Sequence, residues 1–376
     1  MIESVRATRR GFLAGAGAAA VAFGSRGRFL FAQEATRAQT VDETIRGLAD
    51  RAALDMEFQG KTADECRSWQ ESFAAKLRSL LGPHAPPQEW KTVTERRVVL
   101  DDHVREELLL VAAGHPALPV HLLLPLGKSE RPRPGILALH GHGDLGYDAV
   151  AGKEDRPGAA EAIQKVHYDY GRRLAGLGYA VAVPCFMPFG RRMGNRESYG
   201  KQDPCAVTFL RLQLLGKVLI AENLRDCLWA VELLARHERV DAKRLGCVGL
   251  SYGGRMSMLT AALEPRIQVA VISGALNLLQ ERASVQYSCG AQVIPGLLKH
   301  GDVPEIASLI APRPCLWEVG SRDDLVKPPW SDQALERLGR AYGALGAMDR
   351  LHLDRFEGGH EWNGKLAYPL LEKILA

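Results

Sequence analysis

The sequence has little of what a metal protein or a nucleic-acid-binding protein needs. Its seven cysteines include no CxxC pair and no cysteine–histidine cluster with the spacing of a zinc site. Lys and Arg total 48 against 44 Asp and Glu, which gives a formal net charge of +4. Residues 1–32 hold five arginines and one glutamate and so account for all of this net charge. The remainder is close to neutral, so we predict no nucleic-acid partner. The absence of a metal-type cluster predicts no metal, and we expect no cofactor.

Nowhere does the chain contain the roughly 20 consecutive apolar residues that a membrane-spanning helix needs. Residues 1–32 instead place Arg9 and Arg10 before Gly-Phe-Leu and a short Ala/Gly run, which resembles a twin-arginine export signal. Cleavage could follow Ala22-Phe23-Gly24 or Leu30-Phe31-Ala32. We therefore expect a periplasmic or secreted protein that meets the twin-arginine translocase during export and has no stable membrane insertion after signal removal.

The cysteines are spread along the chain rather than paired. Cys185, Cys247 and Cys315 lie in predicted strands, where a buried free thiol behaves as a small apolar group. An oxidising destination would permit a disulfide among the others, and the sequence leaves the pairing open between Cys66, Cys205, Cys227 and Cys289.

The order of apolar patterns predicts an α/β protein with three segments. After residues 1–32, residues 33–94 carry helical spacing up to a stop at Gly82-Pro83, which predicts an N-terminal helical extension. Residues 95–376 begin with short β-type runs typical of antiparallel edge strands. From Pro134, strand runs alternate with helical stretches. This alternation predicts one catalytic domain with a mostly parallel, doubly wound sheet and helices on both faces.

A G-x-S-x-G pattern places Ser251 at a candidate nucleophile position. Residues 249–253 read GLSYG, between a predicted strand, RLGCVGL, and a helix that begins at Tyr252. A nucleophile elbow requires this strand, sharp turn and helix, and its glycines allow the tight backbone turn. The alternative is a serine in a purely structural turn.

A serine nucleophile needs a base, an acid that orients the base, and two backbone N–H groups for the oxyanion. The expected chain order is Ser, acid, His, which here predicts Ser251, Asp323 or Asp324, and His360. The N–H groups of Tyr252 and of His142, in the HGHG loop, are the predicted oxyanion donors. A metal site on the H-x-H pair of this loop would need a third ligand, and none stands at suggestive spacing.

The elbow, the HGHG loop and the stretches IAPRPCLWEVGSRDD and GGHEWNG resemble the α/β-hydrolase superfamily. Over about residues 95–376 the chain is similar to its dienelactone hydrolase-like and acetyl xylan esterase-like branch, which is related to prolyl oligopeptidases. The resemblance implies a metal-free serine hydrolase of carboxylic esters. It also favours Asp323 as the acid, three residues after Gly320, while Asp324 could cap a turn. Dienelactone hydrolases use a cysteine nucleophile, so their substrate does not transfer to Ser251.

We therefore predict a carboxylesterase acting on small-molecule or polysaccharide esters, in particular acetyl or related esters of carbohydrates. Two alternatives remain. A small serine exopeptidase of the prolyl oligopeptidase-like type could use the same triad, although the chain has no propeller or other large N-terminal domain. An inactive hydrolase fold could serve binding, although the candidate triad is complete.

Substrate choice is predicted from the stretch MPFGRRMGNRESYG, residues 187–200, which follows a strand and should form part of the active-site mouth. One of Arg191, Arg192 and Arg196 could bind the carboxylate of an acidic sugar, and Trp362 could offer a flat face to its ring. The alternative is a solvated basic loop whose arginines pair with neighbours such as Glu197 or Asp203.

Overall fold

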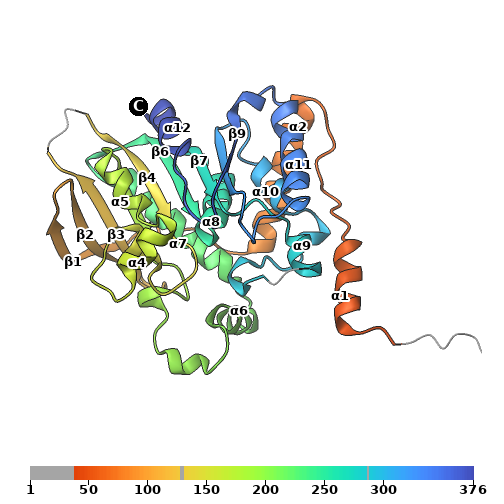
Figure 1. Cartoon of the computed structure of the whole chain (residues 1–376), viewed down its shortest axis with the longest axis horizontal. Coiled ribbons are helices and arrows are strands. Elements are labelled where there is room, and N and C mark those ends of the chain that lie inside the picture. Colours follow the sequence, from red (N-terminus) through yellow and green to blue (C-terminus); the bar gives the residue numbers. More distant parts are fainter. Residues whose placement is uncertain (1–37, 128–130, 286–287) are drawn as a thin grey trace, which may run out of the picture. The chain divides into compact units, whose positions relative to one another are not determined.

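A computed structural model of the chain describes residues 38–127, 131–285 and 288–376. The predicted export signal, residues 1–32, lies outside the described residues. Residues 41–376 form one compact unit, which contains residues 41–94 of the predicted helical extension and the whole predicted catalytic segment. Figure 1 labels most of the helices and strands, which are numbered in chain order.

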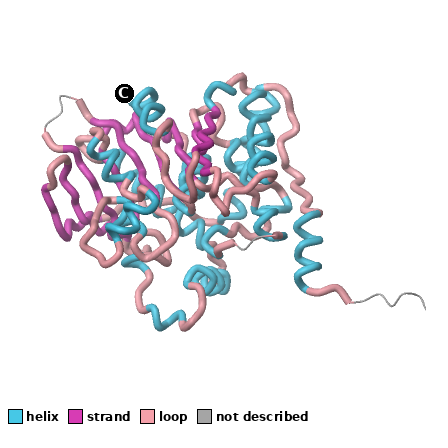
Figure 2. The backbone as a smooth tube through the Cα atoms, in the orientation of Figure 1, coloured by secondary structure: helices cyan, strands magenta, loops and turns pink. Residues whose placement is uncertain are grey.

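Nine strands of the described chain form one mixed sheet in the order β1-β2-β3-β5-β4-β6-β7-β8-β9. Figure 2 shows the strands in magenta. The pairs β1–β2, β2–β3 and β3–β5 are antiparallel. The pairs β5–β4, β4–β6, β6–β7, β7–β8 and β8–β9 are parallel. The strands are β1 Lys91–Val99, β2 His103–Val111, β3 Leu118–Pro125, β4 Arg133–Leu139, β5 Ala180–Pro184, β6 Val240–Leu250, β7 Ile267–Ser273, β8 Cys315–Gly320 and β9 Leu351–Phe356.

Helices connect the strands and cover the sheet. They are α1 Val41–Asp50, α2 Ala63–Leu81, α3 Gly146–Val150, α4 Ala159–Val166, α5 Tyr170–Gly176, α6 Pro204–Leu214, α7 Leu219–Arg236, α8 Tyr252–Leu263, α9 Leu279–Ser284, α10 Val303–Ser308, α11 Trp330–Ala344 and α12 Ala367–Leu375. Five short 3-10 turns lie between them in the described chain, η1 Gly190–Arg192, η2 Arg196–Tyr199, η3 Gly290–Gln292, η4 Leu297–Lys299 and η5 Met348–Arg350.

The hydrophobic core lies on both faces of the sheet. Alternate side chains of a strand point to opposite faces, and β4 accordingly sends Leu137 and Leu139 into one core cluster and Ile136 and Ala138 into the other. The first cluster includes residues of α2, α7, α8, α10 and α11, whereas the second includes residues of α3, α4, α5 and α12. The predicted doubly wound sheet with helices on both faces is therefore confirmed.

The structure refines the expected elements at several points. Three of the helical regions consist of two consecutive helices with no strand between them, namely α1 and α2, α4 and α5, and α6 and α7. The segment between β7 and β8 has no expected element in the sequence pattern, yet it contains α9, η3, η4 and α10. This segment, residues 274–314, contributes to the candidate site described below.

No single described helix is long and apolar enough to cross a membrane; α6 and α7 meet the length and composition criteria only as a pair bent by 96°.

Helix α2 is anchored to the rest of the unit by one face. Its N-terminus has a capping box between Thr62 and Glu65, which satisfies backbone N–H groups that a helix start leaves free. On the buried face, Phe73 is fully buried and stacks on Trp69 with ring centroids 5.3 Å apart. Helices α10 and α11 contact α2 directly.

We predict that Phe73→Ala lowers the free energy of unfolding of the whole unit by about 3–5 kcal/mol, because it opens a cavity in the shared core. Denaturant unfolding followed by tryptophan fluorescence and by circular dichroism measures the change. Glu71→Ala, at an exposed position of the same helix, is the matched control. A loss confined to a separate, early transition would show instead that α2 folds independently of the sheet.

Candidate active site

Ser251 stands at the turn between β6 and α8 in a strained backbone conformation. Its φ is 63° and its ψ is −121°, and it is one of three described non-glycine residues with positive φ. Such a conformation costs about 1–3 kcal/mol and persists only where its surroundings enforce it. The backbone N–H of Ser251 donates to the Ser273 carbonyl at the end of β7, 2.9 Å away. The turn therefore has the geometry expected of a nucleophile elbow.

Close backbone packing explains the glycines of this turn. A Cβ atom on Gly253 would lie 1.8 Å from the Leu139 carbonyl oxygen, and one on Gly249 would lie 2.4 Å from the Gly253 backbone. A Cβ on Gly254 would lie 2.5 Å from the Ser273 carbonyl oxygen. Because no side chain fits at these distances, only glycine lets α8 begin directly against the ends of β4 and β7.

His360 and Asp323 meet beyond the ends of β9 and β8. The His360 Nδ1 atom lies 2.8 Å from Asp323 Oδ2, and Asp323 Oδ1 accepts the Leu325 N–H at 2.8 Å. An ionised carboxylate only accepts hydrogen bonds, so Nδ1 carries the proton and Nε2 is left as an acceptor. Nε2 has no hydrogen-bond partner among the described residues.

The structure separates the two candidate acids. Asp323 has a buried side chain against the imidazole, whereas the Asp324 side chain is 93% exposed and pairs with Lys327 at 3.3 Å. The contact with His360 thus belongs to Asp323, the residue favoured by the sequence resemblance.

Backbone contacts hold the His360 loop against the Asp323 loop and over the elbow. A Cβ on Gly320 would lie 2.1 Å from the Gly359 carbonyl oxygen, and the Arg322 N–H donates to the Gly358 carbonyl at 2.8 Å. A Cβ on Gly274, next to Ser273, would lie 2.8 Å from His360 Cε1. The imidazole therefore lies over the β7 end to which Ser251 is bonded.

The HGHG loop passes beside Ser251. A Cβ on Gly141 would lie 3.2 Å from the Ser251 Cβ. The Gly141 N–H donates a hydrogen bond to the Tyr168 hydroxyl oxygen, 2.6 Å away. The His142 N–H donates no hydrogen bond to a described residue. Tyr252 is the first residue of α8, where an N–H has no partner within the helix. These are the two N–H groups expected to face an oxyanion.

His140 is a structural residue of this loop. Burial lowers the pKa of His140 to about 4, so the ring is neutral. Its Nδ1–H donates to the Gly141 carbonyl at 2.7 Å, and its Nε2 accepts the Phe186 N–H at 2.9 Å. With both nitrogens used, His140 cannot act with His142 as the ligand pair that the H-x-H spacing suggests.

Two cavities meet at Ser251. The first, of about 250 Å³, is lined by Ser251, His142 and residues of α8 and of the segment after β7. The second, of about 510 Å³, is lined by Ser251, His360, the HGHG loop and α4. Ser251 and His360 thus border the second cavity, and the first cavity shares Ser251, His142 and Leu325 with it but is not lined by His360.

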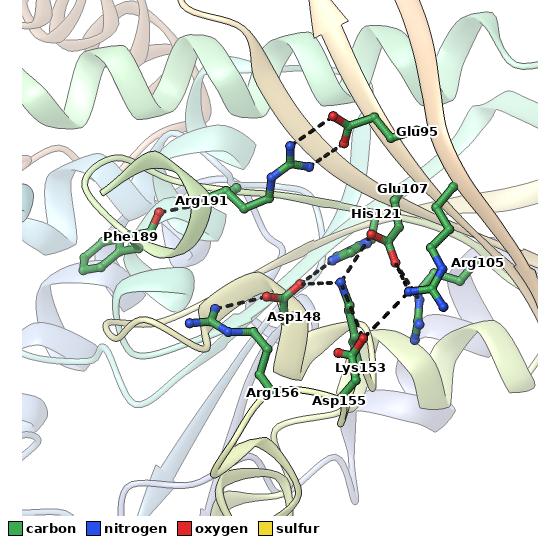
Figure 3. A network of polar contacts seen from close by, with 12 residues as sticks. Glu95, Arg105, Glu107, His121, Asp148, Lys153, Asp155, Arg156, Phe189 and Arg191 are labelled. Carbon is green, nitrogen blue, oxygen red and sulfur yellow. Dashed lines mark hydrogen bonds and ion pairs between the residues drawn. The ribbon is translucent and has the colours of Figure 1, made fainter. Parts of the chain in front are cut away.

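The loop arginines predicted to bind an acidic sugar point elsewhere. Arg191 forms a two-bond ion pair with Glu95 on β1, with nitrogen–oxygen distances of 2.5 and 3.0 Å (Figure 3). Arg192 is buried and pairs with Asp226. Arg196 is exposed and contacts Met193. None of the three lines either cavity at Ser251, so the structure does not support the prediction of a carboxylate site on this loop.

The predicted sugar-binding face of Trp362 is likewise corrected. The indole is 1% exposed and stacks on Tyr170 with centroids 4.7 Å apart. Its Nε1–H donates to the Tyr368 hydroxyl at 3.2 Å. Trp362 therefore belongs to the hydrophobic core, because tertiary packing buries a ring that the sequence places beside a glycine-rich loop.

The described residues do contain a candidate metal-binding cluster. Ligand atoms of His142, Cys205 and Cys289 lie within 4.8 Å of one another, a set that could hold a soft ion such as Zn²⁺. The Cys205 thiol and His142 lower the pKa of Cys289 by hydrogen bonding. All seven cysteines are buried and unbridged. The spacing rule missed this cluster because its members come from three segments distant in sequence.

Comparison with known proteins identifies the family. YtaP of Bacillus subtilis (strain 168), named as a hydrolase, is 32% identical over 292 residues, which cover 76% of this chain and 92% of YtaP. This chain belongs to the same hydrolase family. The profile of the prolyl oligopeptidase family also matches the hydrolase at residues 219–278, which include the elbow.

Solved structures share the fold of this hydrolase. A Bacteroides fragilis protein described as an acetyl xylan esterase superposes with a TM-score of 0.75 at 17% identity, covering 92% of this chain and 97% of that one. A glucuronoyl esterase from Solibacter usitatus superposes with a TM-score of 0.58 at 14% identity, covering 81% and 92%. The α/β-hydrolase fold predicted from the sequence is thereby confirmed.

Sequence reasoning missed the polar residues of the first cavity in this hydrolase. Arg255 lies one turn after Ser251 in α8, and Asn277, Arg282 and Gln292 come from the segment after β7. A charged residue inside the apolar helix sequence YGGRMSMLTAAL was the available signal. The positions after β7 carry no signal of their own, because only the folded chain brings them to Ser251.

Glu318 links the sheet to the His360 loop. It lies fully buried in β8, and its side chain accepts the Gly364 N–H at 2.8 Å. Its backbone carbonyl accepts the Gly274 N–H at 3.0 Å. Burial raises the pKa of Glu318 to about 7, so the folded protein holds a proton that the unfolded chain releases near 4.5.

We predict that the stability of the wild type falls as the pH rises from about 5 to 7, because the unfolded carboxyl ionises first and the folded one resists ionisation. Glu318→Gln still accepts the Gly364 N–H and does not ionise, so the Tm of the wild type relative to this variant should fall across that window. Melting curves at several pH values measure it. Glu357→Gln, an exposed change in the same loop, is the control. A constant difference between wild type and Glu318→Gln would contradict the prediction.

Proposed function

We propose that the protein is a serine carboxylesterase in which Ser251 is the nucleophile, His360 the base and Asp323 the residue that orients the base. The observation that carries the proposal is the joint placement of Ser251 and His360 on one cavity, with the far nitrogen of the imidazole held by a buried carboxylate. A hydroxyl is a weak nucleophile near neutral pH unless such a base removes its proton.

The reaction follows from this arrangement. The Ser251 oxygen attacks the ester carbonyl carbon while its proton moves to His360 Nε2, and the Tyr252 and His142 N–H groups stabilise the oxyanion. The carbon–alkoxy bond then breaks, and the alkoxide takes the proton from Nε2. Water, deprotonated by His360, then attacks the acyl carbonyl carbon. The bond between this carbon and the Ser251 oxygen breaks, the acid leaves, and His360 returns the proton to Ser251.

The proposed substrates are acetyl or related esters of carbohydrates. Support comes from the names of the structural neighbours, which include acetyl xylan and glucuronoyl esterases at low identity, and from the original sequence resemblance. The prolyl oligopeptidase profile keeps a peptidase activity as the second candidate. Turnover of acetylated xylo-oligosaccharides against aminoacyl anilides distinguishes the two. Export to the periplasm or medium remains part of the proposal.

We predict that Ser251→Ala lowers ester turnover by about four to six orders of magnitude, because no other group replaces the nucleophile. Hydrolysis of p-nitrophenyl acetate and labelling by a fluorophosphonate measure the loss, and an unchanged melting curve confirms folding. Ser288→Ala, which changes another serine at the first cavity, is the matched control and should retain activity and labelling. A folded Ser251→Ala protein with near-normal turnover would overturn the mechanism.

We predict that Asp323→Asn lowers kcat by about a thousandfold or more, because the amide leaves the imidazole in the wrong tautomer. Asp324→Asn should stay close to the wild type, since that side chain is exposed and pairs with Lys327. Steady-state kinetics on the same ester compare the two variants. The reverse order of effects would reassign the acid.

A further inference from the structure

The first cavity at Ser251 is lined by two cationic side chains and by no carboxylate. Among its described lining residues are Arg255 and Arg282, together with the amide side chains of Asn277 and Gln292. No aspartate or glutamate lines it. A guanidinium on the wall of a cavity attracts an anion, although Glu281 and Asp323 act through space on Arg282.

The position of His360 indicates which half of an ester enters this cavity. The leaving alkoxide must lie near His360 Nε2 to receive its proton, and His360 lines the second cavity but not the first. The alcohol therefore leaves through the second cavity. The acyl group, attached to Ser251 after the first step, extends into the first cavity toward Arg255.

Arg255 is built into the core without a carboxylate partner. The residue is 2% exposed, its Nη2 donates to Asn277 Oδ1 at 2.5 Å, and its Nε donates to Gln292 Oε1 at 3.4 Å. Its Nη1 has no hydrogen-bond partner among the described residues. The guanidinium is thus oriented by two neutral amides and keeps hydrogen-bonding capacity for a ligand.

The nearest negative charge is already engaged. Asp302 acts on Arg255 through space, but its carboxylate oxygens accept the backbone N–H groups of Leu279, Gln280 and Val303. Asp302 forms no ion pair with Arg255 within 4 Å in the described chain. Arg282, the second cation, donates to the Leu325 carbonyl. Glu281 and Asp323 also act on Arg282 through space, and the Cys289 thiol, whose pKa is lowered, lines the same cavity. The positive charge available to a ligand is therefore that of Arg255.

We propose that Arg255 is a specificity residue that binds a second carboxylate on the acyl part of the substrate, so that the enzyme prefers monoesters of dicarboxylic acids or of other carboxylate-bearing acyl groups. This inference rests on the proposed function and narrows its substrate class. A buried guanidinium donor without a partner is costly, and a carboxylate satisfies it with a charge-assisted hydrogen bond. A plain acetyl group offers Arg255 no acceptor.

The test compares two esters that differ only in charge. Monoethyl glutarate carries a carboxylate at the end of the acyl chain, and ethyl 4-carbamoylbutanoate carries the neutral amide of the same shape. Ethanol release gives kcat and KM for each. We expect wild-type kcat/KM to favour the anionic ester by about tenfold or more, mainly through KM. Arg255→Gln should remove the preference while retaining hydrolysis of the neutral ester, and Arg255→Lys should restore part of it.

The matched control is Arg191→Gln, which removes a guanidinium that Glu95 holds away from both cavities and should leave the preference intact. If Arg255→Gln fails to fold, a second experiment uses the wild type alone. It measures how strongly glutarate, glutaramic acid and glutaramide each inhibit hydrolysis of the neutral ester. The inhibition should then weaken in that order.

The outcomes separate the two proposals. Equal turnover of both esters by the wild type, together with inactivity of Ser251→Ala, overturns the carboxylate site and leaves the esterase mechanism standing. Hydrolysis that survives in Ser251→Ala overturns the mechanism itself. A preference that persists in folded Arg255→Gln overturns the assignment of Arg255.

Discussion

The site depends on the contact between the start of α8 and the end of β4. No Cβ atom fits between Gly253 and the Leu139 carbonyl, because α8 begins directly against the end of β4. Ser251, in the turn before α8, adopts a positive φ. The loop that leaves β4 begins at the same carbonyl and runs beside Ser251. One backbone contact therefore brings the nucleophile and both candidate oxyanion donors, the N–H groups of Tyr252 and His142, to a single point.

The other half of the site is assembled by loops rather than by a strand–helix junction. The turn after β8 presents Asp323, the turn after β9 presents His360, and the Gly320–Gly359 approach sets their separation. Glu318 reaches from beneath to the Gly364 N–H. Glu318 therefore holds the loop that follows His360 against β8, while Asp323 holds the imidazole itself.

The fold and the catalytic candidates were predictable because their signals are local. Strand and helix periodicities and the GLSYG turn are patterns of neighbouring residues, and the order of Ser251, Asp323 and His360 along the chain is read directly from the sequence. The substrate residues were not. Trp362 and Arg192 look available in the sequence but are buried by elements far along the chain. The segment after β7 carries no periodic pattern, so its contribution to the first cavity could not be foreseen.

Arg255 and the loop arginines show how burial decides the role of the same side chain. Arg191 on an open loop gains a carboxylate partner at little desolvation cost, and the pair leaves no charge for a ligand. In α8, Arg255 loses its hydration and gains only amide partners, so its positive charge remains uncompensated at close range. An apolar side chain would fit that helix with less cost to stability. A buried charge retained one turn from the nucleophile is therefore better explained by what enters the cavity than by what holds the fold together.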